Sequence, residues 1–265
     1  MSGGAARAAS ALILLAVTLT SVSLVVTGTA SGELTQHGNL IIRLDGGLSP
    51  RKLPRDRPGP LQVHLEGGLR TVDGSLLPRV TRIELGLPGQ AVITTQGLPT
   101  CSPGRLRFTR RAEALAACRS ALVGRGSLEA SVALPRQQPF TTRASLLAFN
   151  ARVHRHRAIV VHAAAANPPS VAVLVFFFHH GRGRFGTRLV ADLSAALGPW
   201  PRFAQFKLNL GHRYSFHGRG YSYLSASCPA PPRGTAGFFS LARSTYTLVG
   251  GGRISQTITR GCRAA

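Results

Sequence analysis

The sequence predicts an all-β protein, an antiparallel sandwich or half-barrel with one short helix near 110–122. Short runs of alternating apolar and polar residues follow one another from "LQVHLEGGL" (61–69) to "GRISQTITR" (252–260), which is the pattern of half-buried strands. Turn sequences such as Asp73-Gly74, Pro88-Gly89 and Gly250-Gly251-Gly252 separate these runs. Many short strands joined by tight turns favour antiparallel pairing.

The first thirty residues have the pattern of a secretory signal peptide. Arg7 is the one charged residue before Glu33, an apolar run extends from Ala11 to Val26, and small residues follow it. Gly28 and Ala30 occupy the −3 and −1 positions of a cleavage site before Ser31. The apolar run is shorter than the roughly 20 residues that a membrane span needs. We therefore expect a secreted or cell-envelope protein, with an uncleaved membrane anchor as the alternative.

The rest of the chain is expected to form one β domain over 61–265, preceded by an extended lead-in over 31–60. The lead-in is rich in Gly, Pro and Arg ("LDGGLSPRKLPRDRPGP", 44–60), with one strand at Leu40–Leu44. A sub-boundary near 135–139 ("PRQQP") would instead give two smaller β lobes. The run "LVFFF" (174–178) is apolar on both faces and predicts a central strand, flanked by charged and polar gatekeepers. Those flanking residues are His179, His180, Arg182 and Arg184.

The four cysteines are Cys101, Cys118, Cys228 and Cys262. An even number of cysteines in an exported chain indicates disulfides. Three pairings are formally open, and we favour Cys101–Cys118 and Cys228–Cys262. The spacings between the cysteines do not fit the close Cys pairs of zinc sites or the Cys-x-x-Cys of redox motifs.

Local patterns support each pair. Residues 110–122 predict a helix capped by Thr109, with Glu113 in its first turn and Gly124 at its end. Leu115, Cys118 and Leu122 share one face of that helix, and the Pro/Gly-rich loop before it can bring Cys101 back to this face. For the second pair, strand alternation places Cys228 with Leu224 and Ala226, and Cys262 with Ile254 and Ile258. Both cysteines of the second pair are therefore expected on apolar strand faces.

The chain is strongly basic, with 32 Lys and Arg against 9 Asp and Glu and a net charge of +23. Lys52 and Lys207 are its lysines, and this preference for arginine is also typical of GC-rich genomes. Such a charge concentrates anions at the surface. For an exported protein we expect an anionic cell-wall polymer or another polyanion as partner rather than nucleic acid. The alternative is that the arginines are solvated strand faces without a dedicated site.

Two motifs suggest ligands on inspection. "GRGRFG" (181–186) matches the glycine spacing of dinucleotide sites, but no acidic residue follows Asp192 and no alternating strand–helix pattern surrounds it. We interpret it as a hairpin turn, with Phe185, Leu189 and Leu193 pointing inward, and expect no cofactor. In "VHRHRAIVVH" (153–162), His154 and His156 share a strand face and are candidate metal ligands. The alternative is a pair of polar histidines at an exposed strand end.

No catalytic motif is evident. The chain lacks Gly-x-Ser-x-Gly and His-Glu-x-x-His. Glu84 and Glu129 stand between apolar residues in strand-like runs and are expected to face outward, which does not favour a catalytic carboxylate pair. We therefore expect a protein that is not an enzyme.

The segment "HRYSFHGRGYSY" (212–223) mixes aromatic and basic residues and is the candidate ligand surface. Its residues are Arg213, Tyr214, His217, Arg219, Tyr221 and Tyr223. Alternation places Tyr221 and Tyr223 opposite Cys228, so both are expected to point outward. The alternative is a hairpin with cross-strand aromatic packing.

Several segments carry a resemblance to known sequences: "TVDGSLLPRVTRIEL", "QGLPTC", "AEALAACRSALVGRG", "LLAFN", "SYLSASCPAP" and "TRGC". Through them the chain resembles exported, cysteine-stapled, β-rich proteins of high-GC actinobacteria. The resemblance covers about residue 71 to the end. It implies secretion and a disulfide-stapled fold, and it implies no activity.

Together these patterns lead us to expect an exported, non-enzymatic β protein of the cell envelope or extracellular space, with anionic polymers as candidate ligands. The alternative is a carrier of an apolar ligand or lipid in a β cavity. A hydrolase ranks last.

Overall fold

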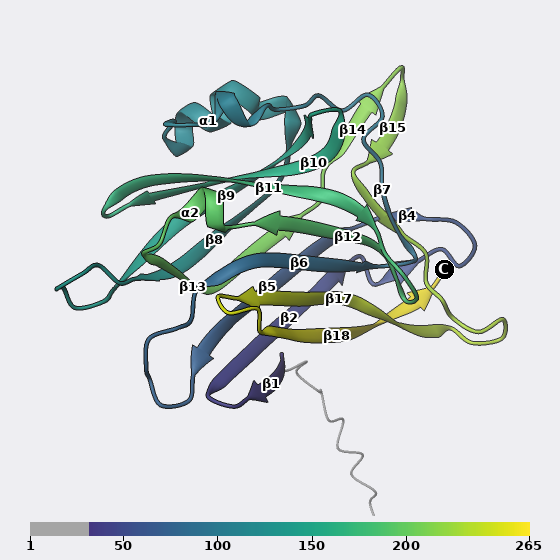
Figure 1. The fold of residues 1–265 in the computed structure, drawn as a ribbon. Helices are drawn as coiled ribbons and strands as arrows, with labels where there is room; N and C mark the ends of the chain where they lie inside the picture. Colours follow the sequence, from purple (N-terminus) through teal and green to yellow (C-terminus); the bar gives the residue numbers. More distant parts are fainter. Residues whose placement is uncertain (1–31) are drawn as a thin grey trace, which may run out of the picture. The chain divides into compact units, whose positions relative to one another are not determined.

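The computed structural model describes residues 32–265, and the expected signal peptide over 1–30 lies outside them. The described part is an all-β structure built on one 13-stranded sheet that curls on itself (Figure 1). Across the sheet the strands follow the order β1 (Glu33–His37), β2 (Leu40–Ser49), β5 (Gln62–Thr71), β13 (Pro201–Leu210), β8 (Leu122–Val132), β9 (Phe140–Val153), β10 (His156–Ala166), β11 (Pro169–His180), β12 (Phe185–Asp192), β6 (Val80–Pro88), β17 (Ala236–Leu248), β18 (Arg253–Ala264) and β3 (Lys52–Leu53). Each pairing between these strands is antiparallel, except the parallel pairing of β3 with β18.

Two smaller sheets and two helices complete the described part. The pair β14 (Arg213–Phe216) and β15 (Arg219–Ser222) forms a hairpin. A three-stranded sheet has the order β4 (Gly59–Pro60), β16 (Leu224–Ala226) and β7 (Ala91–Ile93). The helices are α1 (Arg111–Cys118) and α2 (Ser194–Leu197), with 3₁₀ turns at Pro103–Arg105 and Arg119–Ala121. No helix within 32–265 is long and apolar enough to span a membrane.

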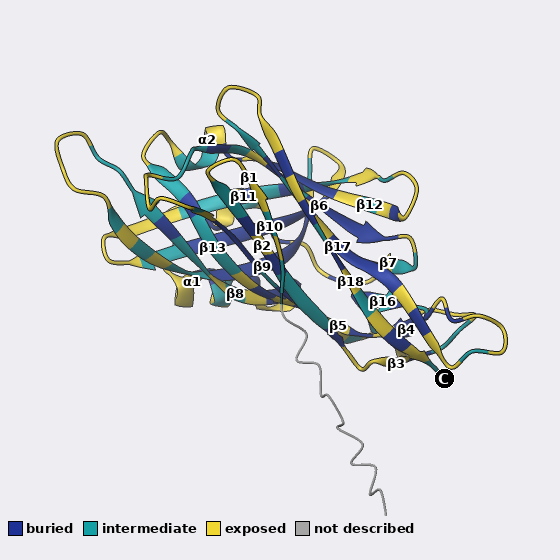
Figure 2. Ribbon diagram, turned by 90° about the horizontal axis from the view of Figure 1, so that it is seen from below, coloured by how far each residue is buried: buried dark blue, intermediate teal, exposed yellow. Residues whose placement is uncertain are grey.

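Strand alternation divides the apolar side chains between two clusters. On β10, Ile159, Val161 and Ala163 belong to the core enclosed by the curled sheet. Ala158 and Val160 face the other way and pack in a second cluster with Ala114 and Cys118 of α1. The sheet is thus covered on both faces where α1 lies against it. Figure 2 shows buried residues in bands along the strands, between intermediate and exposed ones, while most loops are exposed.

The two edges of the curled sheet meet through side chains. Arg260 of β18 donates hydrogen bonds to the Gly46 carbonyl (2.6 Å) and to Asp45 Oδ1 (2.7 Å) of β2. The Thr259 backbone N–H donates to Glu33 Oε1 of β1 at 3.1 Å. These contacts join β18 to β1 and β2 at a seam without a backbone ladder among the described pairings.

The stretch 31–60 differs from the expected extended lead-in. It contributes β1, β2, β3 and β4, and β2 extends to Ser49, beyond the single strand expected at Leu40–Leu44. The reason is that every residue of β2 pairs with β5, including the glycines that read as a turn. Residues 135–139 lie in the loop between β8 and β9, which pair on either side of it.

Three local predictions are confirmed. β11, which contains "LVFFF", lies between β10 and β12. The "GRGRFG" segment is the tight connection from β11 to β12, where Gly183 has a φ of 63° and the Gly181 N–H donates to the Gly186 carbonyl at 3.0 Å. Phe185, Leu189 and Leu193 are buried.

The helix near 110–122 is present, but its expected ends were wrong. Thr109 does not cap it, because its hydroxyl donates to the Leu106 carbonyl at 2.8 Å. The N-cap is Arg110, whose backbone N–H donates to Glu113 Oε2 at 2.8 Å. Gly124 does not end it either, because Gly124 lies inside β8, where a Cβ would come 2.7 Å from the Asn209 carbonyl oxygen of β13.

Candidate functional site

The strand order brings the loops rich in arginine to one end of the curled sheet. The ends of β2, β6, β9, β11, β13 and β18 and the starts of β5, β8, β10, β12 and β17 all lie at this end. We call it the basic end, made of residues 50–58, 154–157, 180–184, 211–220 and 233. It is the end at which β4, β7, β14, β15 and the C-terminus are labelled in Figure 1.

Charge is unbalanced at the basic end. Its basic side chains are Arg51, Lys52, Arg55, Arg57, Arg155, Arg157, Arg182, Arg184, Arg213, Arg219 and Arg233. Within these described segments, Asp56 is the one acidic side chain. The loops at the opposite end, 72–79, 133–139, 167–168, 193–200 and 249–252, carry Asp73, Arg79 and Arg136. Of the two ends of the sheet, the basic end therefore carries far more positive charge.

Some of these arginines have structural contacts, and others do not. Arg55 donates to the carbonyls of Ala230 and Gly234, each at 2.8 Å. Arg157 donates to the Ile93 carbonyl at 2.8 Å and lies 5.0 Å from the Phe178 ring centre. Five other arginines are exposed and make no side-chain hydrogen bond or ion pair with the described residues: Arg57, Arg182, Arg213, Arg219 and Arg233. Exposed guanidinium groups of this kind are available to an anion.

The acidic side chains neutralise arginines elsewhere. Glu84 faces outward from β6, as expected, and its carboxylate lies 3.4, 3.3 and 3.2 Å from the guanidinium nitrogens of Arg82, Arg188 and Arg253. Glu129 also faces outward and pairs with Arg143 at 2.6 Å. These carboxylates therefore pair with arginines on the outer face of the sheet and not with those of the basic end.

The candidate ligand surface at 212–223 forms the β14–β15 hairpin, whose aromatic side chains pack across the strands. Tyr214 and Tyr221 are directly paired, with ring centres 5.7 Å apart. The Tyr214 hydroxyl donates to the Gln96 carbonyl at 2.8 Å, and Phe216 packs against Gly97. Burial, and then the neighbouring Tyr221, raise the pKa of Tyr214. The aromatic face thus holds the 94–97 segment, while Arg213, His217 and Arg219 are exposed.

Tyr223 does not belong to this surface, and its expected outward orientation was wrong. It is 1% exposed, and burial raises its pKa. Strand alternation predicts an outward Tyr223 if Tyr221 to Cys228 form one strand. In the structure, β15 ends at Ser222 and β16 begins at Leu224. The chain leaves the hairpin at Tyr223 and enters the small inner sheet, so the two-residue period is broken there.

His154 and His156 are not on one strand face. His154 and Arg155 form the two-residue turn between β9 and β10, with φ angles of 47° and 67°. Both histidines are exposed, and Arg152, Arg155 and Arg157 flank them. Within 32–265 no group of three or more His, Cys, Asp or Glu side chains is arranged to hold a metal ion.

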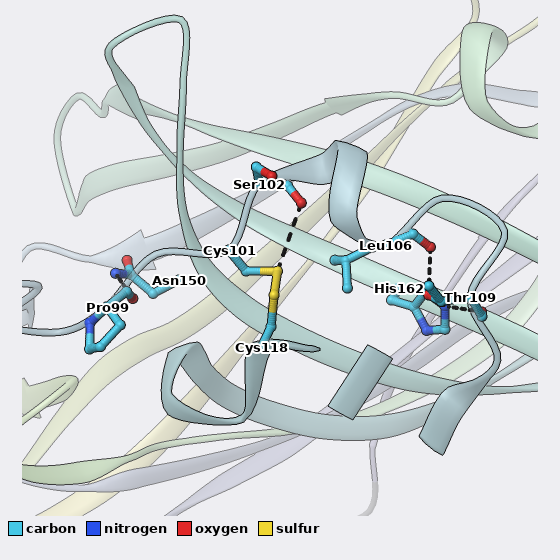
Figure 3. Close-up of a disulfide and its surroundings, with 8 residues drawn as sticks. All are labelled: Pro99, Cys101, Ser102, Leu106, Thr109, Cys118, Asn150 and His162. Atoms are coloured by element: carbon cyan, nitrogen blue, oxygen red, sulfur yellow. Dashed lines mark hydrogen bonds between the residues drawn. A yellow bond between two sulfur atoms is a disulfide. The ribbon is translucent and has the colours of Figure 1, made fainter. Parts of the chain in front are cut away.

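Residues 98–121 cross the outer face of β9 and β10 and form a segment that we call the strap (Figure 3). The Cys101–Cys118 disulfide closes it, and Asn150 Nδ2 donates to the Pro99 carbonyl at 2.9 Å. His162 lies beneath the strap, fully buried, with Nε2 2.9 Å from the Thr109 carbonyl oxygen. Strand alternation in the sequence indicates the face of the strand on which His162 lies, but it gives no sign that the strap buries this face.

A groove of about 640 Å³ runs along the outer face of β11, beside the strap. Its lining is Arg82, Arg107, Phe108, Val171, Ala172, Val173, Val175, Phe177, His179, Val190, Asp192 and Ala196. Sequence reasoning missed this groove, although apolar residues on both faces of "LVFFF" were a signal that its outer face would be in contact with something.

Two apolar cavities of about 80 and 30 Å³ lie in the space enclosed by the curled sheet, and their linings share Ile159, Leu189 and Leu210. Both are smaller than an engineered cavity of about 150 Å³ that accommodates benzene.

The Cys228–Cys262 disulfide lies at the basic end and joins the segment after β16 to β18. Both favoured cysteine pairings are thus confirmed. Comparisons of the chain with family models, with curated proteins and with solved structures find no match.

Proposed function

We propose that this protein is an exported, non-enzymatic binding protein of the cell envelope or extracellular space, which holds an anionic polymer at its basic end. The observation that carries the proposal is the difference in charge between the two ends of the sheet. Arginines from loops far apart in sequence converge at one end of the sheet, and Asp56 is the acidic side chain among those described loops. A focused positive field of this kind attracts polyanions and speeds their association.

Two further observations support the compartment and the absence of catalysis. Disulfides are typical of oxidising compartments outside the cytoplasm, and this chain has two of them. Glu84 and Glu129 are each engaged by arginines rather than facing another carboxylate. The small internal cavities give the alternative, a carrier of an apolar ligand inside the sheet, less support.

Retention on immobilised inorganic polyphosphate, measured as a function of salt, tests the proposal. The variant replaces three exposed arginines of the basic end: Arg182→Gln, Arg213→Gln and Arg219→Gln. The matched control removes the same charge from the strap: Arg105→Gln, Arg110→Gln and Arg111→Gln. Each phosphate contact contributes about 0.7 to the log–log slope of binding against salt on a flexible single strand.

We expect the log–log slope of binding against salt to be smaller in magnitude by about 2 in the basic-end variant, which should also elute at lower salt. The strap variant should keep the slope of the unmodified protein. Equal losses in both variants would show that net charge alone causes retention and would overturn the proposal. Polyglutamate in place of polyphosphate shows whether carboxylates suffice. Recovery outside the producing cell of a chain that begins near Ser31 tests export.

A further inference from the structure

The groove on the outer face of β11, which we call the outer groove, is separate from the basic end and from the enclosed cavities. Its floor comes from alternate residues of β11, namely Val171, Val173, Val175 and Phe177. Six residues of strand span about 20 Å, so the floor is an elongated apolar track. At about 640 Å³ the groove is several times larger than either internal cavity and falls in the range of small-molecule sites.

Phe108 stands at the rim of the outer groove, in the turn that the Thr109 N–H closes on the Leu106 carbonyl at 3.4 Å. Its side chain is 95% exposed and its φ is 63°. A bulky aromatic residue rarely adopts the left-handed region, which glycine occupies without strain. Exposing a large apolar ring in a strained backbone favours neither stability nor solubility, and such strain is typical of ligand-binding positions. The ring is thus positioned to cover an apolar molecule lying on β11.

The charged groups of the outer groove are two arginines and one carboxylate, Arg82, Arg107 and Asp192. Arg107 is exposed beside Phe108 and makes no side-chain hydrogen bond or ion pair with the described residues. Arg82 is shared with Glu84 at 3.4 Å, and Asp192 Oδ1 accepts a hydrogen bond from the Ser194 N–H at 2.8 Å. His179 contributes no negative charge. Arg107 and Asp192 are therefore the charged side chains of the groove that have no ion pair with the described residues, and Arg107 is the cation next to Phe108.

We infer that the outer groove binds a single-chain anionic amphiphile. The acyl chain lies along β11, the Phe108 ring packs over it, and the carboxylate or phosphate headgroup pairs with the Arg107 guanidinium. A free fatty acid and a lysophospholipid share this chemistry. The site is distinct from the proposed polyanion surface, since none of its lining residues belongs to the basic end.

Isothermal titration with laurate tests the inference, with lauryl phosphate as the second headgroup and lauryl alcohol as the uncharged chain. The variants are Phe108→Gly and Arg107→Gln. The matched controls are Arg105→Gln, an exposed arginine in the same strap, and Phe238→Ala, which removes another ring that is 74% exposed. Each variant is also tested on polyphosphate, which separates the amphiphile site from the proposed function.

We expect laurate binding to fall about tenfold or more in each groove variant, because each loses a charge-assisted bond or an apolar contact. The controls bind laurate like the unmodified protein, lauryl alcohol binds more weakly, and polyphosphate retention does not change in Phe108→Gly. The melting temperature of Phe108→Gly stays equal or rises, because glycine relieves the strain. The tighter of laurate and lauryl phosphate identifies the headgroup.

Three results would overturn the inference: unchanged laurate binding in both groove variants, equal binding of lauryl alcohol, or a lowered melting temperature in Phe108→Gly that accounts for its lost binding. A stable dimer that Phe108→Gly dissociates would assign the groove to a second copy of the chain and would equally overturn it.

Discussion

Replacing Cys228 and Cys262 by alanine should destabilise this protein more than replacing Cys101 and Cys118. A disulfide acts mainly by restricting the unfolded chain, and its effect grows with the length of the loop that it closes. The second disulfide joins residues 34 apart in sequence, and the first joins residues 17 apart. The loop-entropy relation then gives about 3.8 kcal/mol for Cys228–Cys262 and about 3.1 kcal/mol for Cys101–Cys118.

These contributions are large beside the total stability of a domain, which is about 5–15 kcal/mol. Reduction of both disulfides should therefore leave a chain that is marginally folded. Urea unfolding followed by far-ultraviolet circular dichroism measures the free energy of unfolding of each alanine pair. We expect the 228/262 variant to unfold at lower urea than the 101/118 variant, with a difference of about 0.6 kcal/mol from loop length alone.

Amide exchange adds a local readout to this prediction. The Cys228 N–H donates to the Pro54 carbonyl at 2.9 Å, and the Thr94 N–H donates to the Tyr223 carbonyl at 3.0 Å. Loss of the second disulfide should speed exchange at these two amides before it affects β9 and β10. A 228/262 variant within 1 kcal/mol of the unmodified protein, with protected amides at both positions, would refute the loop-entropy reasoning.

Two other predictions concern buried and seam residues. Burial raises the pKa of Tyr246 to about 12, against an ordinary value of 10.0. The contribution of Tyr246 to the free energy of unfolding should be complete below pH 10 and be lost as pH rises through about 12, at about 1.4 kcal/mol per pH unit. In urea unfolding at pH 9–12, Tyr246→Phe should make this decline of stability with pH shallower. An unchanged slope of stability against pH would contradict the raised pKa of Tyr246. Arg260→Ala should cost about 2 kcal/mol in the same assay, because it removes the hydrogen bonds to the Asp45 carboxylate and the Gly46 carbonyl at the seam. The exposed Arg263→Ala is the control, and equal losses would show that the seam contacts do not matter.

Features that depend on a short stretch of chain were predictable. The period of two in "RISQTITRGC" placed Cys262 on a buried strand face, and the glycines of "GRGRFG" marked the tight turn between β11 and β12. The face shared by Leu115 and Cys118 identified the first disulfide even though both helix ends were misassigned. In each case the information lies within a few residues, where backbone sterics and side-chain direction decide the outcome.

The misassignments occurred where the local sequence pattern and the true ends of the strands disagree. Tyr223 follows Tyr221 at the strand spacing, but the chain changes sheets between Ser222 and Leu224. The Gly46-Gly47 pair reads as a turn, yet it lies inside β2 because β5 pairs along its whole length. Strand pairing with residues far away in the sequence determines the conformation at both positions. The local alternation of apolar and polar residues carries no information about such pairing.

The sequence by itself determined the all-β class, the two disulfides and the excess of positive charge. The tertiary structure decided where that charge and the apolar surface lie. β13 lies between β5 and β8, and β6 lies between β12 and β17, so loops distant in the chain converge at the basic end. The strap crosses β9 and β10, buries His162 and holds Phe108 beside β11. Strand order and segment packing arise from long-range burial of side chains, so the candidate sites exist only in the folded chain.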